Sequence, residues 1–209
     1  MSKQHDRKRR LRRDLQEVRR SLPPDVLAAA GEALARRTLE LEELAPFLAP
    51  STADGAARRP TVAAYVSMGS EPPTGALLDR LREAGVRVLL PVLMPDNDLD
   101  WAPYEGADRL VPAGWGLHEP AGERLGPQAV AQADVVLLPG LAVDRDGVRL
   151  GRGGGSYDRV LERLDRAGAP AHLVVLLFDA EVRDEVPAEP HDRRVHAAVT
   201  PSGVHRFRH

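Results

Sequence analysis

A glycine-rich segment at residues 151–155 carries the clearest chemical signal in the chain, because four of its five residues are glycine. Glycine permits positive φ angles and lets a ligand approach the backbone closely. A run of backbone N–H groups that leads into a helix binds phosphate, since a helix N-terminus carries about half a positive charge. The flanking Arg149 and Arg152 add guanidinium donors. Asp158 stands where a carboxylate holds Mg²⁺ together with phosphate oxygens, so the segment predicts a site for a phosphorylated ligand and a magnesium ion.

The same residues also have plainer interpretations. A glycine-rich loop is often only a tight turn. The dinucleotide-binding fingerprint fits poorly, because Ser156 stands where its third glycine would be. Asp158 alone would stabilise a helix N-terminus by about 0.3–1 kcal/mol. Tyr157 shares the apolar face of the helix predicted to follow, which favours a packing role for its ring. The segment by itself therefore leaves the ligand open.

Two residue types that many nucleotide and metal sites need are scarce or missing. Only two of the 29 basic residues are lysines, Lys3 and Lys8, so a Walker A phosphate loop with its lysine is excluded. The 209-residue chain has no cysteine, which excludes a disulfide framework, thiol catalysis and thiolate-bound zinc or iron–sulfur centres. Any phosphate chemistry must therefore depend on arginines, backbone amides and a metal ion.

Three further positions are candidates for ligand binding, each with a common structural alternative. Glu71 follows a predicted strand, where a carboxylate would face a ligand, although exposed loop glutamates are commoner. Trp115 stands between two glycines and is more often a loop anchor than a ligand platform. His191-Asp192 follows Pro190 and is typical of a surface turn. The histidines form no H-E-x-x-H pattern, so no zincin site is expected.

The first 20 residues are basic, with nine basic and three acidic side chains, whereas the remainder has a net charge of −8. A spacing of four, three and four residues predicts an amphipathic helix that ends at residues 21–24, with its apolar face formed by Leu11, Leu15, Val18 and Leu22. The arginines are expected elsewhere on its surface: Arg10, Arg12, Arg13 and Arg19. A basic arm on an acidic body indicates an anionic partner or a docking arm. Nucleic-acid binding is the weaker interpretation, because only 4% of the residues are aromatic.

The rest of the chain alternates between strand and helix patterns. A second helix is expected from about Pro24 to Phe47, and an exposed loop over residues 50–60. Short apolar runs typical of strands buried on both faces follow at Val62–Val66, Val86–Leu90, Val135–Leu138, Leu173–Leu177 and Val195–Val199. Helical patterns lie between them, one with Leu77, Leu78 and Leu81 after Thr74, and one with Tyr157, Val160, Leu161 and Leu164. This alternation predicts an α/β fold with a mainly parallel sheet and helices on both faces.

One further strand and a loose C-terminal tail are also expected. Leu99–Tyr104 alternates between apolar and polar residues, as an additional strand would. The tail from His205 to His209 is expected to be frayed. We find no internal repeat and no low-complexity tract.

In order along nearly the whole chain, these motifs resemble the 5-formyltetrahydrofolate cyclo-ligases, also called 5,10-methenyltetrahydrofolate synthetases. The most specific element is Pro139-Gly140-Leu141-Ala142-Val143-Asp144 followed by residues 147–159, Gly-x-Arg-Leu-Gly-Arg-Gly-Gly-Gly-x-Tyr-Asp-Arg. The other elements are residues 8–12, Tyr65-Val66-Ser67-Met68 with Glu71 and Thr74, Trp115–Pro120, Pro187 with His191-Asp192, and residues 199–203. The resemblance implies a three-layer α/β/α sandwich, Rossmann-like, with a mainly parallel sheet.

The resemblance also implies an activity and the residues that support it. The enzyme would convert 5-formyltetrahydrofolate to 5,10-methenyltetrahydrofolate with ATP and Mg²⁺, releasing ADP and phosphate. ATP would be bound by Lys8, Arg9, Arg10, Leu11 and Arg12 and by Arg149, Leu150, Gly151, Arg152, Gly153, Gly154, Gly155, Ser156 and Tyr157. Asp158 and Asp192 would hold Mg²⁺. Val66, Glu71, Trp115 and Arg152 would contact the folate, and Arg152, which would reach both ligands, is the expected catalytic residue.

One departure from the family pattern concerns the folate. Ser156 stands where family members usually carry a tyrosine or phenylalanine that lies against the folate. Serine cannot supply that stacking area, although its N–H still serves the phosphate loop. A protein that binds folate or nucleotide without catalysis is therefore one alternative, and a nucleic-acid-binding protein that uses the basic arm is the other.

The remaining expectations concern organisation and location. Residues 1–209 are expected to form a single domain, with residues 1–48 as N-terminal helices packed on or beside the α/β body. No apolar stretch is long enough to cross a bilayer, and no apolar segment follows the basic N-terminus as in a secretory signal. We therefore expect a monomeric cytoplasmic protein that acts on a small molecule and does not associate with a membrane.

Overall fold

The central element of the fold is a mixed β-sheet. The structure is a computed structural model that describes residues 3–45, 59–189 and 192–208. Within these residues the sheet has seven strands in the order β11-β10-β9-β6-β1-β2-β3. Their bounds are β1 Thr61–Ala63, β2 Arg87–Leu93, β3 Leu99–Pro103, β6 Val135–Pro139, β9 His172–Leu176, β10 Ala197–Val199 and β11 Val204–Arg206. Two small ribbons lie outside it, β4 Leu110–Pro112 with β5 His118–Pro120, and β7 Ala142–Val143 with β8 Arg149–Leu150.

The sheet is parallel in its centre and antiparallel at both edges. Strands β2, β1, β6, β9 and β10 pair in parallel, whereas β3 and β11 pair antiparallel with their neighbours. The chain passes from β1 to β2 on one side and later returns to β6 on the other side of β1. This reversal beside β1 is the topological switch point at which open parallel sheets bind ligands. The prediction of a mainly parallel α/β fold is confirmed.

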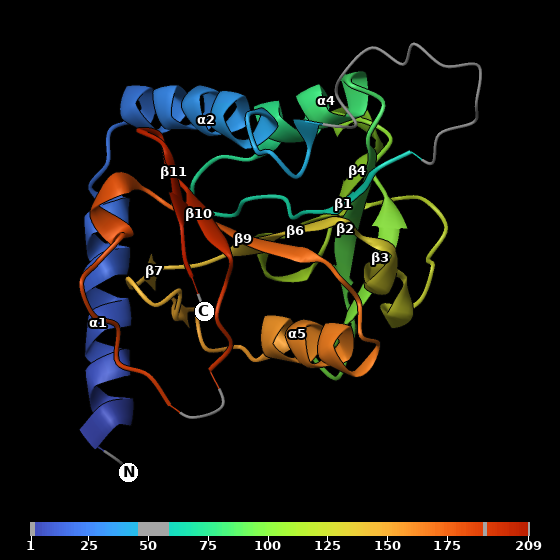
Figure 1. The fold of residues 1–209 in the computed structure, drawn as a ribbon. Helices are drawn as coiled ribbons and strands as arrows, with labels where there is room; N and C mark the ends of the chain where they lie inside the picture. The colour runs from blue at the N-terminus through green and yellow to red at the C-terminus, as the bar shows by residue number, and fades with distance from the viewer. Residues whose placement is uncertain (1–2, 46–58, 190–191, 209) are drawn as a thin grey trace.

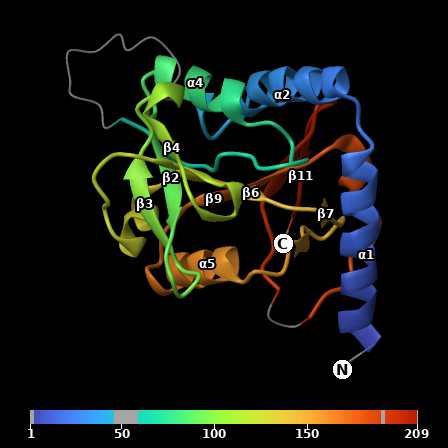
Figure 2. The same ribbon diagram turned by 180° about the vertical axis from the view of Figure 1, so that it is seen from behind.

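Helices cover both faces of the sheet, as Figures 1 and 2 show. Helices α2 (Pro24–Leu39) and α4 (Gly75–Glu83) pack on one face, and α5 (Ser156–Arg166) packs on the other with the 3₁₀ segment Pro127–Gln132. Alternate residues of each strand feed the two cores, because successive side chains of a strand point to opposite faces. In β6, for example, Val135 and Leu137 join the α2 and α4 side, whereas Val136 and Leu138 join the α5 side. The three-layer arrangement is therefore confirmed.

Helix α1 (Lys3–Arg20) stands apart from these layers and runs alongside β7 (Figure 1). Its Leu11 and Leu15 contribute to a small third cluster with Leu141 and Leu150. The apolar face was predicted incorrectly at one position, because Val18 is 55% exposed. Arg19, expected on the surface, is instead 2% exposed and ion-paired to Glu181. The inward face therefore follows Lys8, Arg12, Leu15 and Arg19, a helical spacing that mixes charged and apolar residues.

Two further expectations are corrected by the structure. The second helix ends at Leu39, since the chain turns at Glu40 and buries Leu41 and Leu44 completely; the expected end at Phe47 and most of the expected 50–60 loop lie outside the described residues. The tail is not frayed over its first residues. Thr200 and Gly203 form a turn with reciprocal backbone hydrogen bonds, and β11 then pairs with β10. One edge of β10 offers backbone N–H and C=O groups to β11, and the apolar pattern of the sequence does not show that this edge is available.

The remaining elements follow the sequence patterns. The apolar runs form β1, β2, β6, β9 and β10, and the alternating segment forms the edge strand β3. Leu77, Leu78 and Leu81 of α4 are buried, as are Val160, Leu161 and Leu164 of α5. No helix within the described part of the chain is both long and apolar enough to span a membrane.

Candidate active site

A cavity of about 310 Å³ lies at the carboxyl ends of β1, β2 and β6. One side of it is cationic and glycine-rich, formed by Lys8, Arg12, Arg149 and residues 150–158. The other side is largely apolar, formed by Tyr65, Val66, Met68, Pro91, Leu93, Leu99, Trp115 and Leu117. The cavity therefore has one half suited to phosphate and one suited to a flat, mainly apolar ligand.

The glycine-rich loop forms the floor of the cationic half. It connects β8 to α5, and Gly155 caps the helix in the left-handed conformation, with φ 79° and ψ −13°. Gly153 also has a positive φ of 93°, which side-chain-bearing residues rarely adopt. Within the described residues, the amides of Gly153, Gly154 and Gly155 donate no hydrogen bond to the protein. Together with the first turn of α5 they leave a row of donors free for an anion.

Arg149 lies beneath this loop and is almost completely buried. Its Nη1 donates to the Pro139 carbonyl at 2.9 Å and its Nη2 to Asp158 Oδ1 at 3.1 Å. Burial lowers the pKa of Arg149, and the nearby Asp158 charge opposes that shift. Its Nε is buried without a partner in the described structure. A Cβ on Gly151 would lie 2.8 Å from Nη1, so a side chain there would displace this guanidinium.

Helix α1 supplies two more cations to the cavity. Lys8 is 4% exposed, and its Nζ contacts Glu189 Oε2 at 2.8 Å and Asp192 Oδ2 at 2.6 Å. Burial lowers the pKa of Lys8, but the hydrogen bonds that Lys8 donates to Asp192 and Glu189, together with their negative charges, outweigh it, so that the net pKa shift is upward. Arg12 Nε donates to the Gly151 carbonyl at 2.9 Å, which joins the helix directly to the loop.

The other expected ligands on α1 lie away from the cavity. Arg9 is exposed and pairs with Asp6 at 3.1 Å, and Arg10 is exposed with Asp14 at 3.9 Å. Leu11 packs in the cluster around Leu15. These three residues do not line the cavity, and their assignment to ATP stays a prediction.

The loop between β1 and α4 brings Val66 and Glu71 to the cavity. Glu71 is 7% exposed and fully engaged, since Oε2 accepts the Met68 N–H at 2.9 Å and Oε1 accepts Arg152 Nη1 at 3.1 Å. Arg152, with 43% of its side chain exposed, thereby links the glycine loop to the apolar half. Tyr65 and Tyr157 also line this region, and burial, reinforced by the Glu71 charge, raises the pKa of both. The Tyr157 ring packs against the α5-side core, as its position in the helix pattern predicted.

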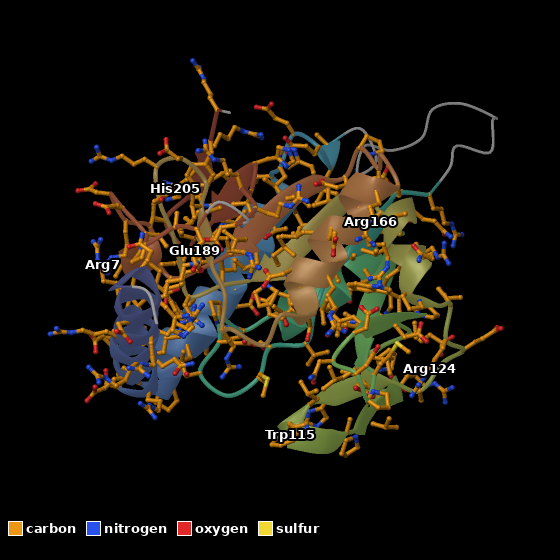
Figure 3. All side chains as sticks on the ribbon, turned by 90° about the horizontal axis from the view of Figure 1, so that it is seen from below. Arg7, Trp115, Arg124, Arg166, Glu189 and His205 are labelled. Carbon is orange, nitrogen blue, oxygen red and sulfur yellow. The ribbon has the colours of Figure 1, made fainter. Side chains whose placement is uncertain are left out.

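Trp115 lines the cavity although its side chain is largely exposed to solvent. It lies at the tip of the β4–β5 hairpin, as Figure 3 shows, with a positive φ of 65° and 88% of its surface exposed. A large aromatic ring in solvent and in a left-handed conformation gains little from its own fold. Since it also lines the cavity, the interpretation as a ligand platform is favoured over a core anchor.

The two carboxylates expected to bind a metal both line the cavity, and each has a cationic partner in this structure. Asp158 pairs with Arg149 and Asp192 with Lys8. No group of three or more metal-binding side chains occurs among the residues that the structure describes. Magnesium that accompanies a nucleotide usually takes one or two carboxylates plus phosphate oxygens, so the pair fits such an ion. His191, which precedes Asp192, lies outside the described residues.

Sequence reasoning missed two acidic residues. Glu181 binds Arg19 in full burial, and Glu119 lines the apolar half. For Glu181 the available signal was the helical spacing of Lys8, Arg12 and Arg19, which places these cations on one face of α1. For Glu119 it was the family motif Trp115–Pro120, which contains this residue. The acidic partners of Lys8 and Arg19 are more than 160 positions away along the chain.

Comparisons with known proteins agree with this geometry. A model described as the 5-formyltetrahydrofolate cyclo-ligase family matches residues 4–201. The 5-formyltetrahydrofolate cyclo-ligase of Mycolicibacterium smegmatis is 43% identical over 199 residues, covering 93% of each chain. That of Escherichia coli is 35% identical over 146 residues, 69% of this chain and 79% of the relative.

The fold is also that of a solved structure, Aquifex aeolicus 5,10-methenyltetrahydrofolate synthetase. The TM-score is 0.77 at 24% identity, with coverage of 97% of this chain and 93% of the other. By the extent of the family match and the similarity of these relatives, the chain belongs to the 5-formyltetrahydrofolate cyclo-ligase family of enzymes.

Proposed function

We propose that the protein catalyses the ATP- and Mg²⁺-dependent cyclisation of 5-formyltetrahydrofolate to 5,10-methenyltetrahydrofolate, releasing ADP and phosphate. The observation that carries the proposal is the divided cavity, in which free amides and buried cations face an apolar half with an exposed tryptophan. A triphosphate suits the first half and a reduced pterin the second. The two ligands would thus meet in a single enclosure.

The formyl oxygen of the substrate is a poor leaving group, and phosphorylation would make it a good one. The formyl oxygen of the substrate attacks the γ-phosphorus of ATP, and the bond to the ADP oxygen breaks. The nitrogen at position 10 then attacks the activated formyl carbon and loses its proton, and the oxygen departs with the phosphate. No nucleophilic side chain is required; the protein aligns the two reactants and stabilises the charge that spreads over the phosphoryl oxygens.

Particular residues support these tasks. Lys8, Arg12 and Arg149 surround the glycine loop and offer positive charge to the phosphates. Arg152 joins that loop to Glu71, and this contact supports a role for its guanidinium between the two ligands. Its assignment as the catalytic residue rests on this bridging position. Val66 and Trp115 offer apolar surface to the folate.

Magnesium would be held by Asp158 and Asp192 together with phosphate oxygens. When bound, the ion neutralises phosphate charge and orients the chain of phosphates. The carboxylates would exchange their present partners, Arg149 and Lys8, for the metal. Both cations would then be available to the phosphates, which is the role proposed for them.

A turnover assay tests the proposal. Mixing the protein with MgATP and 5-formyltetrahydrofolate is expected to produce the methenyl absorbance and one ADP per molecule converted. Ser156 lines the cavity in place of the family's aromatic residue, which motivates a binder without catalysis as the alternative. Binding of 5-formyltetrahydrofolate without ADP release would favour that alternative. Salt-sensitive binding of nucleic acid that is lost on deletion of residues 1–20, without turnover, would favour the basic-arm interpretation.

A further inference from the structure

The carboxylates that line the cavity differ in whether they have an ion-pair partner, and the proposed function assigns no role to the unpaired one. Of the described residues that line the cavity, four are acidic: Glu71, Glu119, Asp158 and Asp192. Three of these have an ion-pair partner. Glu71 pairs with Arg152, Asp158 with Arg149, and Asp192 with Lys8. Glu119 has no such cation among the residues that the structure describes. Among these four described carboxylates, Glu119 is therefore the one without a cationic partner in this structure.

Glu119 is also held in a defined place. It lies in β5, and its Oε1 accepts the Leu93 N–H at 2.9 Å. Leu93 is the last residue of β2, so the carboxylate sits at the carboxyl end of a central strand, the edge where parallel sheets bind ligands. Oε2 has no hydrogen-bond partner in the described parts of the chain. The backbone contact thus fixes one oxygen and leaves the other for the cavity.

Glu119 shares the apolar half of the cavity with Pro91, Leu93, Leu99 and Leu117. It is half-buried, so donors from a ligand can reach its second oxygen. Arg152 reaches the same half but is paired with Glu71. Donors for the second oxygen of Glu119 would therefore come from a ligand.

We propose that Glu119 binds the amino-pyrimidine edge of the pterin and so sets the orientation of the folate in the cavity. This inference rests on the proposed function. The pterin edge presents two adjacent N–H donors, from the ring nitrogen and the exocyclic amine, and a carboxylate is the acceptor that matches such a pair. Glu71 is less suited to this task, because both of its oxygens already accept hydrogen bonds within the protein.

Equilibrium binding of 5-formyltetrahydrofolate, measured by calorimetry without nucleotide, tests the inference. Glu119→Gln keeps an oxygen for the Leu93 N–H but removes the charge and turns a donor toward the donors of the pterin. We expect the Kd for 5-formyltetrahydrofolate to rise about 10- to 100-fold, the loss typical of a hydrogen bond to a charged group. The thermal midpoint and the Kd for ATP are expected to stay unchanged. Glu123→Gln is the matched control, because Glu123 is exposed in the following loop and lines no part of the cavity.

A second ligand separates a direct contact from a general disturbance. An analogue of 5-formyltetrahydrofolate without the 2-amino group is expected to bind the wild-type protein more weakly than the natural compound. Glu119→Gln is expected to discriminate between the two ligands much less. Equal Kd values for 5-formyltetrahydrofolate in wild type and variant, or undiminished discrimination in the variant, would overturn the inference. Absence of folate binding by the wild type would overturn the proposed function as well. If the wild type binds folate and the variant binds it equally well, only the role of Glu119 is overturned.

Discussion

Replacing Glu181 with alanine is expected to lower the free energy of unfolding by about 3–5 kcal/mol, the usual cost of leaving a buried charge without its partner. Arg19 and Glu181 are 2% and 4% exposed. Arg19 Nε and Nη2 donate to the two Glu181 oxygens at 2.6 and 2.7 Å, and Nη2 also donates to the Gly140 carbonyl at 2.6 Å. The alanine variant strands that guanidinium and deprives the Phe178 N–H of its acceptor. Urea denaturation at equilibrium measures the loss.

A double variant provides the control for this prediction. Arg19→Met with Glu181→Leu removes both charges and fills similar volume, and such replacements are often neutral or stabilising. We expect it to be much more stable than the single variant. The exposed pair of Glu162 and Arg166 provides a second control, since Glu162→Gln should change stability by less than about 0.5 kcal/mol. A Glu181→Ala variant as stable as wild type would show that the buried pair does not stabilise the fold.

Replacing Asp158 with asparagine is expected to reduce kcat/KM for the cyclisation by roughly 100-fold or more while the fold is retained. The side chain is 72% exposed, so its removal creates no cavity. The amide oxygen of asparagine still accepts the hydrogen bond from Arg149, whereas the negative charge offered to the metal is lost. Steady-state kinetics with varied Mg²⁺ and ATP measures the effect, and thermal denaturation verifies that the protein is folded.

The control for Asp158 lies on the same helix. Glu162→Gln removes an exposed carboxylate one turn further along α5 and is expected to leave kcat/KM unchanged. Full activity of Asp158→Asn would remove this residue from the proposed metal site. If both variants lose kcat/KM equally, the effect comes from the net charge of the helix and not from a metal contact of Asp158.

The elements of the sheet could be predicted because their signals are local. Each buried strand is a short apolar run, and α4 and α5 repeat leucine or valine at spacings of three and four residues. The glycine loop was identifiable for the same reason, since residues 149–158 contain the free amides, the guanidinium and the carboxylate in one stretch. Such features need no knowledge of which segments meet in space.

The errors arose where a distant partner determines the local structure. Arg19 is buried because Glu181 and the Gly140 carbonyl receive its hydrogen bonds, so a helix face that includes it cannot be identified by hydrophobicity alone. Val18 is exposed as a consequence, although its position fits an apolar stripe. The tail forms β11 because its backbone pairs with the edge of β10. For Glu119, the sequence carries no sign that every other cavity carboxylate is already paired.

Transfer of phosphate to the formyl oxygen inside the divided cavity can be followed with 5-formyltetrahydrofolate whose formyl oxygen carries a heavy isotope. During turnover with MgATP, we expect one labelled oxygen to enter the inorganic phosphate for every methenyltetrahydrofolate formed, as measured by mass spectrometry. Label in the water, with unlabelled phosphate, would show that the formyl oxygen is not phosphorylated.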